Sequence, residues 1–245
     1  MIGKIALILF ILVGISYQGK AQEHLTHSIW NELLAQYVTE EGKVNYKGFV
    51  KDEVLLNQYL DSLSAHHPDE SWNKDDRLAF WINAYNAFTV KLIVMNYPVK
   101  TIKELGGSIY KVNTPWDIKF ITIGNETYDL NNIEHGIIRK KFEEPRIHFA
   151  VNCASISCPR LRNEAFIGER LNEQLDDQAR YFINNPDKNK IGKKKAYLSK
   201  IFKWFAGDFK TKYGSVNDFI NIYSVTNVTK KFEVYFLDYD WNLNE

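Results

Sequence analysis

The sequence predicts an α+β protein, with helices packed around a small and mainly antiparallel sheet. Long segments with apolar residues at helical spacing alternate with short segments of strand character, which is typical of this class. Hydrophobic residues make up 45% of the 245 residues and charged residues 25%, as in folded globular proteins. Neither an internal repeat nor a linker rich in glycine and serine divides the chain, so we expect a single domain over residues 22–245.

The first 21 residues have the pattern of a secretory signal peptide. Lys4 supplies a positive charge, residues 5–15 are almost wholly apolar, and the small residues Gly19 and Ala21 mark a cleavage point. The apolar run is shorter than the roughly 20 residues that span a bilayer. We therefore expect export, either to a periplasm or out of the cell, with no stable membrane span after cleavage. A retained membrane anchor is the alternative.

The first helices are predicted from the spacing of apolar residues. Residues 24–37 and 54–63 each place such residues three and four positions apart. Residues 77–95 are apolar on nearly every face, so we expect this segment to be the buried central helix. Asp75 or Asp76 is the expected cap at its start.

Asn83 and Asn86 lie on one side of this central helix. A buried amide without partners costs on the order of 1–3 kcal/mol, so other groups must hydrogen-bond both side chains. Neighbouring backbone would satisfy them in a purely structural role. Alternatively, the two amides line a polar cavity and orient a catalytic group.

The remainder of the chain is predicted to form short elements. Gly124 and Asn125 indicate a compact hairpin turn between strands at residues 119–123 and 126–128. A helix is expected over residues 130–142. A buried strand is expected at 146–151 and an amphipathic helix at 167–183. Further short elements are expected at 197–198, 201–209, 216–223 and 234–239.

The charges nearly cancel, with 31 basic and 30 acidic residues. No overall field would attract nucleic acid, so we expect no nucleic-acid partner. The sequence contains no HExxH motif, no paired CxxC motifs and no glycine-rich phosphate loop. We therefore expect neither a metal nor another cofactor.

The strongest candidate for chemistry is the segment HFAVNCASISCP at residues 148–159. Cys153 follows the predicted strand at its accessible end, where a neighbouring imidazole would lower the thiol pKa and supply a thiolate. Strand alternation turns His148 away from Cys153, whereas His135 could reach inward from its helix. Glu134 projects about 100° away from His135 round that helix, so it is a poor orienter of the imidazole but a good partner for a nearby arginine.

We take Cys153 as the candidate nucleophile and His135 as its base, and Asn83 or Asn86 as the group that orients the base or donates to the oxyanion; of the two, Asn83 is the candidate catalytic residue. The candidate binding residues are Asn86, Glu134, Arg146, His148 and Asn152. Other readings of the cysteines stay open. Cys153 and Cys158 could close a small disulfide loop in an exported protein, act as a redox switch, or be plain buried thiols.

Several motifs, in order along the chain, resemble those of one family. They are GKVNY, AFWINAYNA, LNNIEHGIIR, PRIHFAVNCASISCPRLRNEAF, the segment at 203–209 and YDWNLN. On these motifs the chain resembles the family catalogued as domain of unknown function 547, over nearly all of residues 22–245. The resemblance implies a single-domain fold, and the family has no agreed reaction. The positions that it singles out are Asn83, Asn86, Glu134, His135, Arg146, His148 and Cys153.

Two functional hypotheses follow. In the first, the protein is an exported thiol-dependent hydrolase or acyl transferase, and Cys153 attacks an amide or ester. In the second, a non-catalytic envelope module binds a small molecule, peptide or glycan in a polar cleft of Asn, His and Arg side chains. An imidazole within about 4 Å of the Cys153 sulfur favours the enzyme, since proton transfer needs hydrogen-bond reach. A disulfide to Cys158 favours the binding module.

Overall fold

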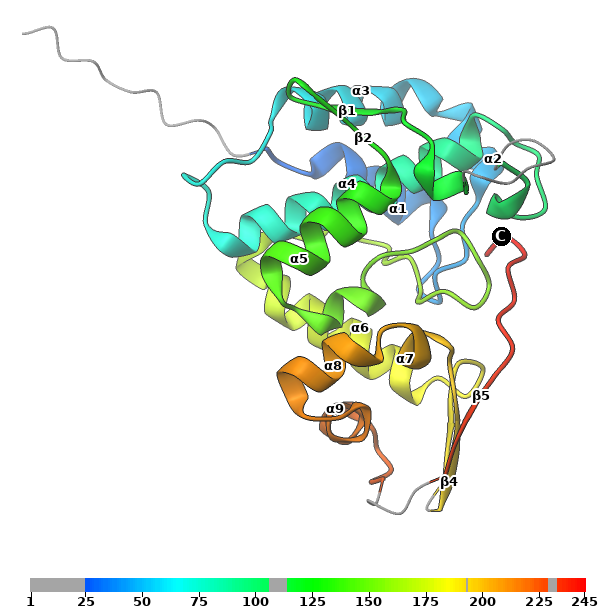
Figure 1. Cartoon of the computed structure of the whole chain (residues 1–245). Coiled ribbons are helices and arrows are strands. Elements are labelled where there is room, and N and C mark those ends of the chain that lie inside the picture. The colour runs from blue at the N-terminus through cyan, green and yellow to red at the C-terminus, as the bar shows by residue number, and fades with distance from the viewer. Residues whose placement is uncertain (1–24, 106–113, 193, 229–232) are drawn as a thin grey trace, which may run out of the picture.

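A computed structural model describes residues 25–105, 114–192, 194–228 and 233–245 (Figure 1). The predicted signal peptide at residues 1–21 lies outside this described part. Within it, helices and two small sheets form an α+β fold, which confirms the predicted class. No helix in the described ranges is both long enough and apolar enough to cross a membrane.

The first four helices build the upper part of the molecule in Figure 1. Their bounds are α1 Ser28–Tyr37, α2 Tyr46–Lys51, α3 Glu53–Ala65 and α4 Lys74–Val94. Helix α4 starts earlier than predicted because Asn73 is its cap, with a side chain that accepts a hydrogen bond from the backbone N–H of Asp76. The predicted caps Asp75 and Asp76 instead occupy the first turn, where negative charge favours the helix dipole.

Helix α4 is the central element of the fold, as the sequence predicts. Every residue from Leu78 to Val90 is buried, because α2, α3 and two short helices further along the chain pack around α4. A helix that is enclosed on all sides needs no polar face. The asparagines within it must therefore find hydrogen-bond partners in the neighbouring segments.

The strands form two sheets rather than one. Strands β1 (Ile121–Ile123) and β2 (Glu126–Tyr128) make the predicted hairpin, and Gly124 in its turn has a φ of 61°. The second sheet holds β3 (Lys190–Ile191), β4 (Lys195–Leu198) and β5 (Glu233–Phe236). Its β3–β4 pairing is antiparallel and its β4–β5 pairing is parallel, so the strand pairs are mainly antiparallel.

The predicted helix at 130–142 is present, but its Asn132–Ile138 part (η3) is a π-helix, which continues into the α-helix α5 at Arg139–Phe142. The expected strand at 146–151 is a 3₁₀ helix, η4, at Pro145–Phe149. Proline fixes a helical φ at the first position of η4, and the side chain of Glu144 caps the turn by accepting from the Arg146 N–H. Residues 147–151 are buried on every side, so their apolar character does not reflect a sheet face.

The remaining helices follow in order along the chain. They are η1 Ile102–Leu105, η2 Pro115–Asp117, η5 Gly168–Arg170, α6 Leu171–Asn184, α7 Ile201–Trp204, α8 Ala206–Tyr213 and α9 Val216–Tyr223. The short element expected at 201–209 is thus two helices, α7 and α8, that are divided at Phe205. After β5 the chain runs back toward the first helices (Figure 1). There the backbone N–H of Val44 donates to the carbonyl of Asn244, at 2.8 Å.

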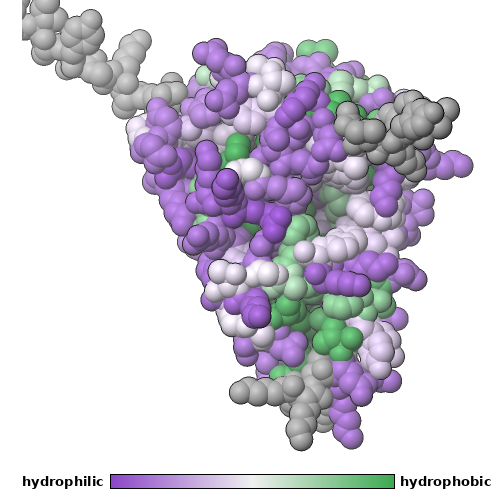
Figure 2. All heavy atoms as spheres, in the orientation of Figure 1, coloured by the Kyte–Doolittle hydropathy of each residue, from purple (hydrophilic) through white to green (hydrophobic). Residues whose placement is uncertain are grey.

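The buried side chains form two hydrophobic clusters. The larger one surrounds α4, and the smaller one lies among α6, α7, α8 and α9. Helix η4 lies between them, because Ile147 belongs to the first cluster and Phe149 to the second. The surface is mostly hydrophilic, with hydrophobic side chains gathered toward the lower end of the molecule, around the second sheet (Figure 2).

Candidate functional site

An aromatic cavity of about 200 Å³ lies where α4, η3, η4, α7 and the C-terminal segment meet. Its aromatic walls are Tyr85, Trp116, Trp204, Phe205, Tyr239 and Trp241. Trp116, Trp204, Tyr239 and Trp241 pack on one another. The ring centroids of Tyr239 and Trp241 are 4.5 Å apart, and those of Trp204 and Tyr239 are 4.8 Å apart. The polar part of the lining is Asn131, Glu134, His135 and His148. The sequence prediction had named three of these four polar residues.

Cys153 and Cys158 also line the aromatic cavity, and they are joined by a disulfide with a Cα–Cα separation of 6.2 Å. This corrects the assignment of Cys153 as a nucleophile, because a cysteine in a disulfide has no thiolate, which is the form that attacks a substrate. The Cys153 sulfur lies 3.4 Å from the Tyr239 hydroxyl, and the Cys158 sulfur accepts a hydrogen bond from that hydroxyl at 3.2 Å. Of the alternatives that the sequence left open for the two cysteines, the structure contains the disulfide.

Asn152 shapes the disulfide loop instead of binding a ligand. Its side-chain oxygen accepts from the backbone N–H of Ala154 at 2.8 Å, and its amide donates to the carbonyl of Pro159 at 2.7 Å. These bonds hold Ala154 at a φ of 57°, in the left-handed region. The predicted binding residue Asn152 is buried and is not among the residues that line the aromatic cavity.

Asn86 connects the same loop to the central helix. Its amide donates to the carbonyl of Ala150 at 2.9 Å, and its oxygen accepts from the backbone N–H of Asn152 at 2.8 Å. Both polar atoms of the Asn86 side chain are therefore hydrogen-bonded to the backbone segment that leads into the disulfide loop. The structural role that the sequence left open is the one observed for Asn86.

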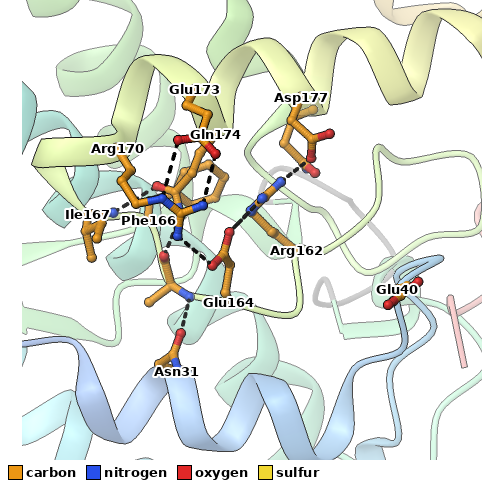
Figure 3. Close-up of polar contacts among 12 residues, drawn as sticks. Asn31, Glu40, Arg162, Glu164, Phe166, Ile167, Arg170, Glu173, Gln174 and Asp177 are labelled. Atoms are coloured by element: carbon orange, nitrogen blue, oxygen red, sulfur yellow. Dashed lines mark hydrogen bonds and ion pairs between the residues drawn. The ribbon is translucent and has the colours of Figure 1, made fainter.

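Asn83 has the same kind of role at a different segment. Its amide donates to the carbonyl of Phe166 at 2.8 Å, and its oxygen accepts from the Phe166 N–H at 3.0 Å. The surrounding segment is fixed by further polar contacts, including those of Arg162 with Glu164 and Asp177 (Figure 3). The assignment of Asn83 as an oxyanion donor is wrong in this structure, because its polar atoms are occupied and it does not line the cavity.

His148 is the most buried polar side chain of the aromatic cavity, with 2% of the residue exposed. Its Nε2 atom lies 2.7 Å from Oδ2 of Asp208, and its ring stacks on Phe205 at a centroid distance of 3.9 Å. The expectation that His148 faces away from the disulfide is wrong, because η4 is a helix and does not alternate like a strand. Burial lowers the pKa of His148, and the hydrogen bond to Asp208 opposes this shift.

Arg139 hydrogen-bonds His135, and Asp208 hydrogen-bonds His148. Arg139 donates to both carboxylate oxygens of Asp208, at 2.8 and 2.9 Å, and to Nδ1 of His135 at 3.2 Å. The hydrogen bonds from His148 and Arg139 hold the pKa of Asp208 well below its usual range. Prediction from the sequence missed both Arg139 and Asp208 as site residues. Both lie in motifs that carried the family resemblance, which was the available signal.

Glu134 brings a carboxylate to the aromatic cavity, with 11% of its side chain exposed. Its Oε1 atom is 3.8 Å from Nδ1 of His135. Burial first, and then the neighbouring Glu134 carboxylate, raise the pKa of Tyr85 well above its ordinary value. Because η3 is a π-helix, its turns are wider than those of an α-helix, and Glu134 and His135 both line the cavity.

Arg146 lies outside the aromatic cavity. Its guanidinium holds the Glu144 carboxylate through two hydrogen bonds of 2.8 Å and also binds Asp176 at 2.7 Å. It lines a second cavity of about 480 Å³, which Arg139 and Asp208 also border. The predicted cleft of Asn, His and Arg side chains is therefore corrected, because the arginine and the asparagines predicted for it do not line the aromatic cavity.

Among the described residues, no group of three or more His, Cys, Asp or Glu side chains is placed to hold a metal ion.

Together these features define an α+β protein with a small aromatic cavity, an internal disulfide in its wall and a buried histidine–aspartate pair behind it. Residues 70–183 match the model of the family described as protein of unknown function, DUF547, which confirms the resemblance seen in the motifs. The motifs at 42–46, 203–209 and 239–244 lie outside the matched range. No curated protein and no solved structure matches the chain.

Proposed function

We propose that the protein binds a small molecule in the aromatic cavity and does not act through Cys153. The observation that carries this proposal is the composition of the cavity, in which six aromatic rings face a buried carboxylate and a buried imidazole. Concave, mainly apolar sites with a few convergent polar groups are the usual form of small-molecule sites. The disulfide removes the thiolate that hydrolysis or acyl transfer through Cys153 requires.

The polar atoms of the cavity support a ligand that donates hydrogen bonds. Nδ1 of His148 is buried and has no hydrogen-bond partner in the described part of the chain. Such an atom costs on the order of 1–3 kcal/mol when it stays unpaired, and a bound donor would recover that cost. The aromatic walls would bury the apolar body of the same molecule.

A titration with matched wall variants tests this proposal. A panel of small aromatic and alicyclic compounds that carry amine, hydroxyl or carboxylate groups is titrated while the tryptophan fluorescence is followed. Trp204→Ala shortens the cavity wall, whereas Tyr235→Ala removes an equally exposed ring from β5, since both residues are 47% exposed. We expect saturable binding that weakens about tenfold in Trp204→Ala and is unchanged in Tyr235→Ala. Binding that ignores Trp204→Ala, or no saturable binding at all, would contradict the proposal.

We also propose that the protein is exported. Two observations support this: the signal-peptide pattern of residues 1–21 and the disulfide between Cys153 and Cys158, since disulfides persist mainly in oxidising compartments. Expression of the full chain in a bacterium with a periplasm, followed by cell fractionation and intact mass measurement, tests it. We expect a periplasmic product that begins at Gln22. A cytoplasmic product that retains residues 1–21 would contradict export.

A further inference from the structure

We propose that the ligand of the aromatic cavity carries a protonated primary or secondary amine, which binds between the Glu134 carboxylate and Nδ1 of His148. This inference rests on the proposed function and names the chemical class of its ligand. Three independent observations carry it: the charge of the lining, the direction of its hydrogen bonds, and the aromatic rings beside them.

The permanent charge of the cavity lining is negative. Glu134 is its carboxylate, and no lysine or arginine is among the described residues that line it. Two basic groups contact lining residues without lining the cavity themselves: Arg139 is held by both carboxylate oxygens of Asp208 and borders the second cavity, and Lys103 packs over the ring of Trp241. An anionic ligand would therefore meet the buried Glu134 carboxylate without a lysine or arginine in the lining to pair with, which is unfavourable.

Two buried polar groups of the cavity lining, the Glu134 carboxylate and the His148 ring, can accept hydrogen bonds, and Glu134 already accepts one from the Tyr85 hydroxyl. Asp208 is ionised and accepts from Nε2 of His148, because the carboxylate cannot donate. Since burial disfavours the doubly protonated ring, the proton resides on Nε2, and Nδ1 carries a lone pair. An ionised Glu134 is likewise acceptor-only. A ligand group that satisfies both must donate two hydrogen bonds, which an ammonium group does.

The aromatic wall suits a cation as well. The faces of tryptophan and tyrosine attract cations, and the attraction grows when water is excluded. The same wall already holds one ammonium of the protein itself, because Nζ of Lys103 lies 3.7 Å from the ring centroid of Trp241. A quaternary amine would fit the rings but could not donate to Nδ1 of His148, so we infer an amine that bears at least two N–H groups.

The test compares three probes of similar shape: 2-phenylethylamine, 2-phenylethanol and phenylacetate. Calorimetric titrations of the wild-type protein near neutral pH are expected to give an affinity for the amine about tenfold above that for the alcohol, with the carboxylate weakest. Glu134→Gln keeps the size of the side chain and removes its charge, so the preference for the amine over the alcohol should disappear. Glu32→Gln, on the exposed face of α1, is the matched control and should keep the preference.

The outcomes separate this inference from the proposed function. Saturable binding of the alcohol or the carboxylate at least as tight as that of the amine would overturn the amine inference and leave the binding function standing. An amine preference that survives in Glu134→Gln would also overturn it. Absence of binding by all three probes would count against both. Circular dichroism and thermal unfolding of each variant establish that a lost preference does not come from a lost fold.

Discussion

Nε2 of His148 lies 2.7 Å from a carboxylate oxygen of Asp208, and this contact fixes which ring nitrogen faces outward from the pair. The two residues come from different elements, η4 and α8, and meet behind the aromatic cavity. Arg139 orients the carboxylate from its other side. The imidazole of His148 is therefore held by a network of hydrogen bonds to charged groups, which are stronger than hydrogen bonds between neutral groups.

The tautomer of His148 is the first prediction. Nitrogen NMR of the ¹⁵N-labelled protein should show a neutral ring with its proton on Nε2, because Asp208 accepts there. The pKa of this ring should lie below the ordinary value of 6.5, because burial disfavours the charged form. A proton on Nδ1, or a pKa above 6.5, would contradict the arrangement.

A second prediction concerns pH and His27. Burial lowers the pKa of His27 from 6.5 to about 4, and its Nδ1 lies 2.7 Å from the Tyr59 hydroxyl. As the pH falls through this window, the unfolded chain binds a proton before the folded one does. The free energy of unfolding should therefore decrease from about pH 6.5 to about pH 4.

The variant His27→Gln isolates this contribution, since glutamine still offers Tyr59 a hydrogen-bond partner. Urea unfolding across the same pH window should show that the wild type loses on the order of 2 kcal/mol more than the variant. His148 and the carboxylates remain in both proteins, so their contributions cancel in the comparison. Parallel pH profiles for the two proteins would show that His27 has no such role.

The disulfide gives a third prediction. Removing it in the Cys153→Ser/Cys158→Ser double variant should lower the free energy of unfolding by about 2 kcal/mol, the value for closure of a very short loop. The same loop binds the C-terminal segment: the N–H groups of Ile156 and Ser157 donate to the carbonyls of Asn242 and Asp240. Hydrogen exchange at these two amides should accelerate in the variant. Unchanged exchange would show that the segment is held independently of the disulfide.

The fourth prediction concerns the buried amide of Asn86. In Asn86→Ala, the carbonyl of Ala150 and the N–H of Asn152 lose their partners inside the core, and we expect a loss of about 2–4 kcal/mol in the free energy of unfolding. Asn96→Ala, in the exposed turn after α4, is the control and should cost less than about 1 kcal/mol. Chemical denaturation of both variants measures the difference. Equal losses would contradict a special role for Asn86.

The architecture and much of the site were predictable, because periodicity and local turn chemistry are written in the sequence. The burial of residues 78–90 follows from their apolar character on nearly every face, and the hairpin follows from Gly124 and Asn125. The sequence also identified Glu134, His135, His148 and Cys153, all of which line the aromatic cavity.

The roles of these residues were harder to predict, since they depend on backbone geometry that short patterns do not specify. A buried 3₁₀ helix and a buried strand both appear in the sequence as a continuous run of apolar residues. The side-chain alternation of a strand was therefore applied to a segment that is a helix, and it predicted the wrong orientation for His148. The π-helix at η3 likewise altered which side chains of that segment share a face. The partnership with Asp208 joins residues that are 60 positions apart, which no local pattern reports.

Helix η4 carries His148 at the junction of the two hydrophobic clusters, with Ile147 packed in one and Phe149 in the other. The imidazole therefore occupies its position only while both halves of the interior are intact. Damage to either half, even far from the aromatic walls, would displace the ring and empty the cavity. Binding of the proposed ligand would therefore depend on both hydrophobic clusters, and a bound ligand would in turn stabilise the packing of one cluster against the other.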